Sequence, residues 1–359
     1  MTIEAIPAQS FSSLFHIAVL AVALLVLLAC LISRNHGDDP PPTQVLGYCF
    51  VAFVTLFIGL RPVSGAFVDM VGYARLYDLV RLGVVVPDLP DPLFNALLHR
   101  SADVVGAPAF FLLCAALYVL PLYFACAQWF GPQWFLGFLM IVSITTFWAY
   151  GVNGIRNGIA TSLFIFALSR RHRLSQAAWM LVAAGFHLSL IIPAAAYLTT
   201  LLVRRSGPYF VAWLACIPLS LVFGSFFQGL FGGLDINDDR VSYLLVQADA
   251  SIFRFTGFRW DFLLYSSIAV AAGWFYIYRK RVADPRYVQL LSVFLASNGG
   301  WLLVIDSNYS NRFAYLSWFL IGPVLVYPLL ASRLTVQRGV KAALIVTASA
   351  VVSLALSFY

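Results

Sequence analysis

The chain has 359 residues, of which 62% are hydrophobic and only 10% are charged. Its mean hydropathy of +0.88 lies far outside the range of soluble globular domains, in which roughly a quarter of the residues are charged. The composition therefore excludes a soluble domain and indicates a polytopic membrane protein. The net charge of +7 reflects cytoplasmic anchoring of helices rather than nucleic-acid binding.

Apolar runs long enough to cross a hydrocarbon core of about 30 Å recur along the whole chain. We predict an all-α fold, a helical bundle in a single integral membrane domain over residues 1–359. The first run lacks a basic flank before it and is too long for a signal peptide, so we expect it to be retained. The ten predicted full crossings cover approximately 11–33, 43–60, 108–128, 132–150, 152–169, 207–227, 260–278, 286–305, 313–331 and 340–358.

Basic residues gather in short segments between these runs. Thirteen of the twenty-two Lys and Arg residues do so, and the positive-inside rule places these segments in the cytoplasm and both termini outside. The other nine basic residues are all arginines on the predicted outer half, where a guanidinium can bind phosphate through two donors. Four of these nine are interpreted as anchors of helix ends, namely Arg61, Arg75, Arg100 and Arg254.

Residues 175–203 form one over-long apolar run between Arg173 and Arg204. A single crossing would leave one basic cluster outside, so we predict a re-entrant helical hairpin that turns near His187. Thirteen helical residues rise only about 20 Å, which places His187 at membrane depth. Non-helical backbone at that depth requires a protein cavity or water. A polar group there indicates function, although a satisfied core histidine is the alternative.

Two predicted outward-facing loops, residues 61–107 and 228–259, carry most of the polar side chains. In the first, Asp69, Tyr73, Tyr77 and Arg81 recur every four residues and share one face of a predicted interfacial helix. The alternative is a solvated face with tyrosines in the aromatic belt. Asp91 precedes a proline and is interpreted as the N-cap of a second short helix, a structural role that suffices for it, with a catalytic role as the minority alternative.

The second loop contains Asp235-Ile-Asn-Asp-Asp-Arg240, which imitates the start of a calcium loop. We reject a calcium site because Arg240 and Val246 occupy the positions that require glycine and glutamate. The loop ends at Arg259, for which the sequence offers no structural role, whereas Asp261 could cap the next helix.

Two further arginines begin predicted apolar helices on the outer side. Arg156 lies in Asn153-Gly-Ile-Arg-Asn-Gly-Ile-Ala160, and Arg312 lies in Ser310-Asn-Arg-Phe-Ala-Tyr315. An arginine in lipid is costly and indicates a functional site. Because a cation at a helix N-terminus also opposes the macrodipole, we expect both arginines and the helix amides to converge on an anion.

These segments together resemble the EpsG family of polysaccharide polymerases, functional relatives of the Wzy O-antigen and capsule polymerases. The resemblance covers nearly the whole chain, with two departures: aspartate replaces the common glutamate at Asp91, and a glycine-rich lead before Asp69 is missing. The segments that carry it are Asp69 with Tyr73, Asp91-Pro-Leu-Phe94, Asn153 to Ala160, Phe186-His-Leu-Ser189, Phe258-Arg-Trp-Asp-Phe-Leu-Leu-Tyr-Ser266 and Ser310-Asn-Arg-Phe-Ala-Tyr-Leu-Ser-Trp318.

The resemblance implies an enzyme of the bacterial cytoplasmic membrane whose active site faces outward. It would transfer a polymer on undecaprenyl diphosphate to the next lipid-linked oligosaccharide repeat, releasing undecaprenyl diphosphate. The lipid bilayer and these lipid-linked oligosaccharides would be its partners, with a chain-length regulator and a flippase as candidates. No cofactor or metal is expected.

Such a reaction requires a base and donors for the departing diphosphate. The candidate catalytic residues are His187, Asp69 as the rival base, Arg156 and Arg312. The candidate substrate-binding residues are Arg259, Arg240, Tyr73, Asn311, Asn153 and Ser189.

Three alternatives share parts of this pattern. A glycosyltransferase that uses a lipid monophosphate sugar, or an O-antigen ligase with lipid A as its acceptor, would also work on the outer face. A transporter of lipid-linked oligosaccharides would show repeated halves with broken helices, and the sequence shows no convincing repeat.

Overall fold

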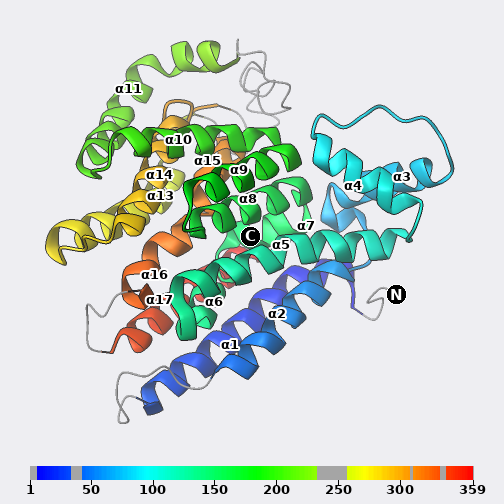
Figure 1. The fold of residues 1–359 in the computed structure, drawn as a ribbon, viewed down its shortest axis with the longest axis horizontal. Helices are drawn as coiled ribbons and strands as arrows, with labels where there is room; N and C mark the ends of the chain where they lie inside the picture. The colour runs from blue at the N-terminus through cyan, green and yellow to red at the C-terminus, as the bar shows by residue number, and fades with distance from the viewer. Residues whose placement is uncertain (1–5, 34–42, 233–256, 308–309, 332–336, 359) are drawn as a thin grey trace. The chain divides into compact units, whose positions relative to one another are not determined.

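The computed structural model describes residues 6–33, 43–232, 257–307, 310–331 and 337–358. Within these ranges the regular structure is helical throughout (Figure 1). The chain divides into two compact units, Met1–His187 with Leu329–Tyr359, and Leu188–Pro328. The all-α fold is thus confirmed, while the single membrane domain stays a prediction.

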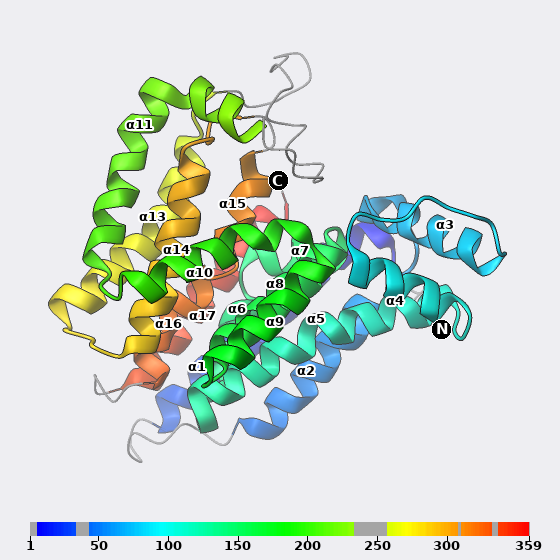
Figure 2. The ribbon, with the colours of Figure 1, turned by 45° about the horizontal axis from the view of Figure 1, so that its top comes forward.

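The first unit is built around α5, which packs against α2, α6 and α8. The first and last helices, α1 and α17, pack together, and α3 and α4 lie beside one end of α5 (Figure 2). Its helices are α1 (Phe11–Ser33), α2 (Gln44–Gly59), α3 (Met70–Arg81), α4 (Pro92–Ala102), α5 (Ala107–Phe130), α6 (Trp134–Val142), α7 (Thr145–Val152), α8 (Ile155–Ser169), α9 (Arg173–Phe186) and α17 (Arg338–Leu356).

The second unit is arranged around α14, which packs against α10, α11, α13 and α15. Its helices are α10 (Ile191–Leu202), α11 (Gly207–Gly232), α13 (Trp260–Trp274), α14 (Pro285–Leu302), α15 (Ser310–Trp318) and the greater part of α16 (Ile321–Ala331).

Six helical stretches among the described residues are long and apolar enough to cross a membrane, so the chain is a multi-pass membrane protein. The predicted ten full crossings are not confirmed. Several predicted runs form shorter or broken helices, including Gln44–Gly59, Ile155–Ser169 and Leu188–Leu202. The six stretches are Ala8–Ser33, Ala107–Val142, Gly207–Leu230, Trp260–Arg279, Ser310–Ala331 and Arg338–Leu356.

The predicted crossing at 132–150 is interrupted by a break between α6 and α7. Ile144 is extended, with φ −83° and ψ 140°, so backbone groups at the break need other partners. The hydroxyls of Ser353 and Ser349 on α17 donate to the Ser143 carbonyl at 2.6 and 3.2 Å. This satisfied carbonyl explains how an apolar run of sequence can contain a break, which hydropathy alone does not reveal.

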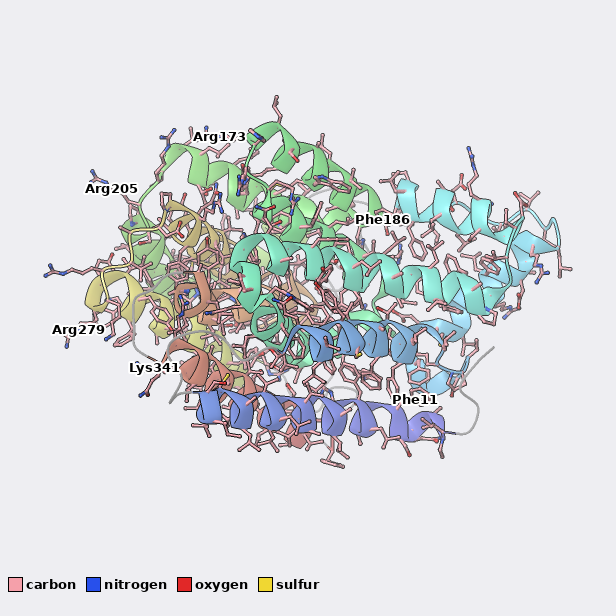
Figure 3. All side chains as sticks on the ribbon, turned by 60° about the horizontal axis from the view of Figure 1, so that its bottom comes forward. Phe11, Arg173, Phe186, Arg205, Arg279 and Lys341 are labelled. Carbon is pink, nitrogen blue, oxygen red and sulfur yellow. The ribbon has the colours of Figure 1, made fainter. Side chains whose placement is uncertain are left out.

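Arg173 and Lys341 mark one end of the first unit, and the opposite end carries arginines of α3 and α4. Figure 3 shows Arg173 and Lys341 toward one end, and Phe11 and Phe186 toward the other. Helix α9 runs between Arg173 and Phe186, and its packing against α4 associates α4 with the end that carries Phe186.

A buried polar network joins four helices of the second unit. The amide oxygen of Asn298 on α14 accepts from Trp213 Nε1 at 2.7 Å. Its Nδ2 donates to the hydroxyls of Ser266 at 3.2 Å and Ser317 at 2.9 Å. Trp318 Nε1 donates to Ser266 Oγ at 2.8 Å. In an apolar surrounding, each of these groups would be costly to leave unpaired.

Replacing Asn298 with alanine should destabilise the protein, because Trp213 Nε1 and Ser317 Oγ would each lose a buried partner. Interhelical hydrogen bonds in membrane proteins contribute about 0.6 to 1.7 kcal/mol each. We therefore expect a lower unfolding temperature for the detergent-purified variant. The matched control is Ser297→Ala, which removes a buried hydroxyl that has no hydrogen-bond partner among the described residues. Equal unfolding temperatures for the two variants would contradict a stabilising network.

Candidate functional site

One buried carboxylate lies at the centre of a polar cluster in the first unit. Asp91 Oδ2 accepts from Arg156 Nη1 at 2.5 Å. Its Oδ1 lies 3.1 Å from His187 Nδ1. The Asp91 side chain is 1% exposed, whereas those of Arg156 and His187 keep 17% and 10% of their surface. The carboxylate thus lies behind two side chains that retain contact with the surroundings.

Three helix ends bring these residues together. Asp91 immediately precedes α4, Arg156 is the second residue of α8, and His187 follows the last residue of α9. Helix α9 packs against both α8 and α4. A Cβ on Gly185 would lie 2.7 Å from Leu93 Cδ1, so a glycine allows the close approach of α9 to the start of α4.

Asp91 has a different role from the one the sequence suggested. It does occupy the N-cap position before Pro92, but its side chain makes no capping hydrogen bond. Its two carboxylate oxygens face Arg156 and His187 instead. The interpretation that capping accounts for Asp91 is therefore wrong. The sequence signal for this role is the place of Asp91 in the Asp91-Pro-Leu-Phe94 motif, although local helix rules alone explain an aspartate before proline.

Tyr73 on α3 extends the cluster. Its hydroxyl accepts from Arg156 Nε at 2.8 Å, and the Arg156 guanidinium carbon lies 5.8 Å from the centre of its ring. The ring also meets Phe94 edge to face at 5.4 Å. Burial raises the pKa of Tyr73 above its usual value even though Arg156 lowers it. The neutral phenol therefore holds Arg156 in place without adding a charge.

The other members of the predicted α3 face have separate roles. Tyr77 is fully buried, and its hydroxyl donates to the Ser101 and Val105 carbonyls at 2.8 and 2.9 Å. It is therefore a core residue rather than part of a solvated face. Asp69 lies at the N-cap of α3 and is exposed. The carboxylate bonded to His187 belongs to Asp91, and the role of Asp69 as a base stays a prediction.

Arg61 supports the turn that precedes Arg156. Its fully buried guanidinium donates to the Ile58 carbonyl and, at 2.9 Å, to the Val152 carbonyl at the end of α7. This agrees with its interpretation as an anchor of a helix end. Gly158 allows α7 to fold onto α8, because a Cβ there would lie 2.7 Å from the Tyr150 carbonyl oxygen.

Two predicted substrate-binding residues carry buried oxygens. Asn153 Oδ1 lies in the turn between α7 and α8, and Ser189 Oγ lies in the short helical turn Leu188–Leu190. Neither oxygen has a hydrogen-bond partner among the described residues. Their contact with substrate stays a prediction.

The predicted break at His187 is present in the chain. Helix α9 ends at Phe186, His187 is extended with φ −159° and ψ 120°, and α10 begins at Ile191. Helix α9 packs against α8 and α4, whereas α10 packs against α14 and α15. The helix boundaries agree with the sequence analysis, but a re-entrant hairpin and its membrane depth are not confirmed.

The predicted residues of the second unit are only partly described. Arg259 donates to both carboxylate oxygens of Asp261, at 2.9 and 2.6 Å, and lies 3.6 Å from the Phe262 ring centre. The view that Arg259 lacks a structural role is therefore wrong. Asp261 lies in the first turn of α13, where its carboxylate also accepts from the Phe262 backbone amide. Arg240 lies outside the described residues.

Arg312 begins α15, as predicted, and is exposed, with Asn311 preceding it. Arg156 belongs to the first unit, and Arg259 and Arg312 belong to the second. The convergence of these guanidinium groups on one anion stays a prediction.

The fold and the cluster define a multi-pass helical membrane protein with an ion-paired site at the ends of three helices. Comparison with protein families matches the EpsG family over residues 44–359. The chain therefore belongs to the EpsG family, as its motifs indicated. Searches of curated proteins and of solved structures find no significant match. Family membership suggests a polysaccharide polymerase with glycosyltransferase-like chemistry.

Removing one partner of the Asp91–Arg156 pair should destabilise the protein more than removing both. Breaking a buried pair leaves an uncompensated charge, at a cost of about 3 to 5 kcal/mol. We expect Asp91→Asn and Arg156→Gln each to lower the unfolding temperature. The double variant should recover part of that loss. Additive losses in this double-mutant cycle would show that the two side chains are not energetically coupled.

Proposed function

We propose that the chain polymerises undecaprenyl-diphosphate-linked oligosaccharide repeats on the outer face of the bacterial cytoplasmic membrane. The observation that carries the proposal is the Asp91 cluster, because its four side chains come from four separate EpsG motifs. Tyr73, Asp91, Arg156 and His187 are far apart in sequence, yet hydrogen bonds link them within one unit. A shared local role in helix capping does not account for this.

The proposed reaction joins an acceptor hydroxyl to the anomeric carbon of the growing chain. The new C–O bond forms as the bond from that carbon to the diphosphate oxygen breaks. The bonding electrons leave with undecaprenyl diphosphate, and the acceptor proton passes to a base. Direct displacement of this kind inverts the anomeric configuration. A trapped covalent glycosyl-enzyme intermediate would contradict it.

We assign the base to His187. An ionised carboxylate only accepts hydrogen bonds, so the contact with Asp91 Oδ1 places the imidazole proton on Nδ1. The lone pair then lies on Nε2, which can take the acceptor proton. Asp91 would stabilise the resulting imidazolium, as the carboxylate does in a catalytic triad. Asp69 is the rival base.

Arg156 would donate hydrogen bonds to the departing diphosphate. Nη1 and Nε are engaged with Asp91 and Tyr73, which fixes the plane of the guanidinium and leaves Nη2 to supply donors. Prepositioned donors in a low-dielectric site stabilise developing charge without reorganisation. Because Asp91 already offsets part of the Arg156 charge, further cations would be needed to balance a diphosphate. Arg312, Arg259 and Arg240 are the proposed contributors, with Asn311, Asn153 and Ser189 contacting substrate.

The outward orientation is supported by the charge distribution of the first unit. Arg173 and Lys341 lie toward one end, and Phe186, next to His187, lies toward the other (Figure 3). The positive-inside rule, applied to the short basic segments around Arg173 and Lys341, places their end in the cytoplasm. The cluster would then face outward, where a chain-length regulator and a flippase would be partners.

A glycosyltransferase that uses a lipid monophosphate sugar and an O-antigen ligase remain the competing enzymatic assignments, and a transporter is the assignment from a different class. Product analysis separates them. In a polymerase-deficient strain, single capped repeats indicate lost polymerisation, whereas absence of outward-exposed repeats indicates failed flipping. Transfer of preformed polymer to lipid A would identify a ligase.

Substitutions in the cluster should stop chain extension. We expect His187→Gln to reduce turnover at least a hundredfold, the usual contribution of a general base, with smaller effects on binding of the lipid-linked repeat. Arg156→Lys should also stop chain extension, because an ammonium cannot donate to Asp91, Tyr73 and phosphate in one plane as a guanidinium does. The assay is in vitro polymerisation of a defined lipid-linked repeat, with Arg75→Lys on the exposed face of α3 as control. Normal polymer from Arg156→Lys would contradict the proposed geometry.

Polymerisation should continue in the presence of EDTA. No group of three or more His, Cys, Asp or Glu side chains is placed to hold a metal within the part of the chain that the structure describes. The proposal assigns charge stabilisation to guanidinium groups, which act without a metal. Loss of activity in EDTA, restored by a divalent cation, would show that a metal is required.

A further inference from the structure

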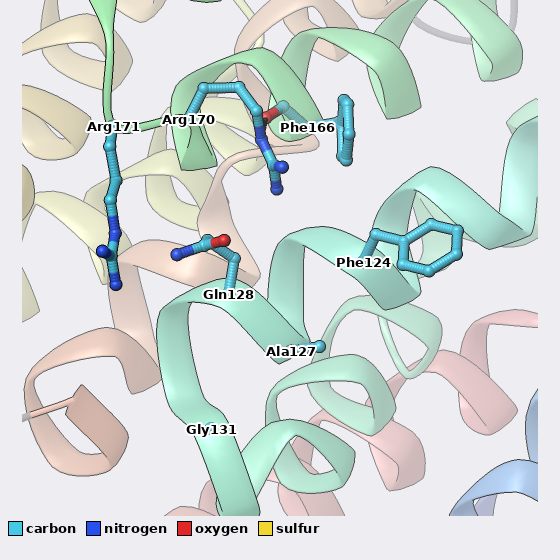
Figure 4. Close-up of a pocket in the computed structure, with 7 residues that line it drawn as sticks. All are labelled: Phe124, Ala127, Gln128, Gly131, Phe166, Arg170 and Arg171. Carbon is cyan, nitrogen blue, oxygen red and sulfur yellow. Dashed lines mark hydrogen bonds between the residues drawn. The ribbon is translucent and has the colours of Figure 1, made fainter.

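A second polar site lies at the other end of α8. A cavity of about 680 Å³ is lined by residues near the C-terminal ends of α5 and α8 (Figure 4). None of its seven lining residues is acidic. They are Phe124, Ala127, Gln128, Gly131, Phe166, Arg170 and Arg171.

The cavity carries two guanidinium groups, one of which is held firmly. Arg170 Nη2 donates to Ser169 Oγ at 2.8 Å, and its guanidinium carbon lies 3.9 Å from the Phe166 ring centre. Gln176 Nε2 donates to the Arg170 carbonyl at 3.0 Å. Arg171 is exposed, and Figure 4 shows its side chain extending past Gln128. Guanidinium groups suit phosphate oxygens, and the Arg170 group is already held in place.

The cavity is also partly apolar at its outer edge. Phe124 on α5 is 51% exposed, and Ala127 lies one turn further along the same helix. Arginines on one side and an exposed aromatic ring on the other fit a ligand with a charged head and an apolar body. A free phosphate ion would use only the charged side.

The position of the cavity in the first unit indicates which membrane leaflet it meets. Arg156 and Arg170 lie at opposite ends of α8, about 20 Å apart along the helix axis. The Arg170 end adjoins Arg173, which begins α9 and lies toward the same end of the unit as Lys341 (Figure 3). The positive-inside rule therefore places the cavity at the cytoplasmic leaflet, whose anionic lipids attract arginines near the membrane surface.

We propose that this cavity binds the phosphate group of an anionic phospholipid of the cytoplasmic leaflet. Arg170, Arg171 and the Gln128 amide would donate to the phosphate oxygens. Phe124 and Ala127 would contact the glycerol and the upper acyl chains. The site is separate from the Asp91 cluster and does not depend on the proposed polymerase activity.

Native mass spectrometry of the full-length protein, exchanged into mixed micelles containing phosphatidylglycerol or phosphatidylcholine, tests this proposal. We expect selective retention of phosphatidylglycerol, reduced about fivefold for each arginine removed in Arg171→Gln and Arg170→Gln/Arg171→Gln. The matched control is Arg173→Gln, which removes a neighbouring exposed charge outside the cavity and should retain the lipid.

Several results would overturn the proposal. They are equal retention by wild type and double variant, equal retention of phosphatidylcholine, and displacement of the lipid by millimolar inorganic phosphate, which would indicate a soluble anion. Preferential retention of undecaprenyl phosphate would make the cavity a substrate site instead. If the double variant fails to fold, Arg171→Glu alone provides the test. Arg171 is exposed, so its replacement leaves the Arg170 contacts intact. The new carboxylate should repel the lipid phosphate and abolish selectivity.

Discussion

The local structure of the candidate site depends on one carboxylate that serves two partners. Asp91 is almost fully buried, and each of its oxygens meets a different side chain, Arg156 or His187. A buried charge is tolerated only when it is paired and hydrogen-bonded. The start of α4, the start of α8 and the end of α9 must therefore stay close together. Tyr73 and Arg61 then fix Arg156 and the turn before it.

Helical class, membrane character, family membership and the main helix boundaries could all be predicted from the sequence. The break at His187 and the starts of α8 near Arg156 and α15 near Arg312 follow from charge and apolar periodicity. Charge spacing was informative because a cation in an apolar run has few acceptable positions. Motifs from distant segments supplied the family, which the comparison over residues 44–359 supports.

The sequence did not reveal which polar groups meet one another. Asp91 had a sufficient local explanation as an N-cap, so its pairing with residues 65 and 96 positions away was missed. For Arg259 the opposite happened: the sequence offered no local role, yet its partner Asp261 lies only two residues further on. The ten crossings are not confirmed, because apolarity alone does not distinguish one continuous helix from two short helices joined at a satisfied break, as at Ser143.

The two serines that satisfy the Ser143 carbonyl come from α17, about two hundred residues later in the chain. Until those residues are synthesised, the Ser143 carbonyl at the junction between α6 and α7 lacks these two donors. Residues 188–328 separate the two sequence segments of the first unit, so that unit cannot be completed during early translation. The last helix would thus pack against the first unit late in biogenesis. A truncation that removes α17 would leave the Ser143 carbonyl without its two serine donors.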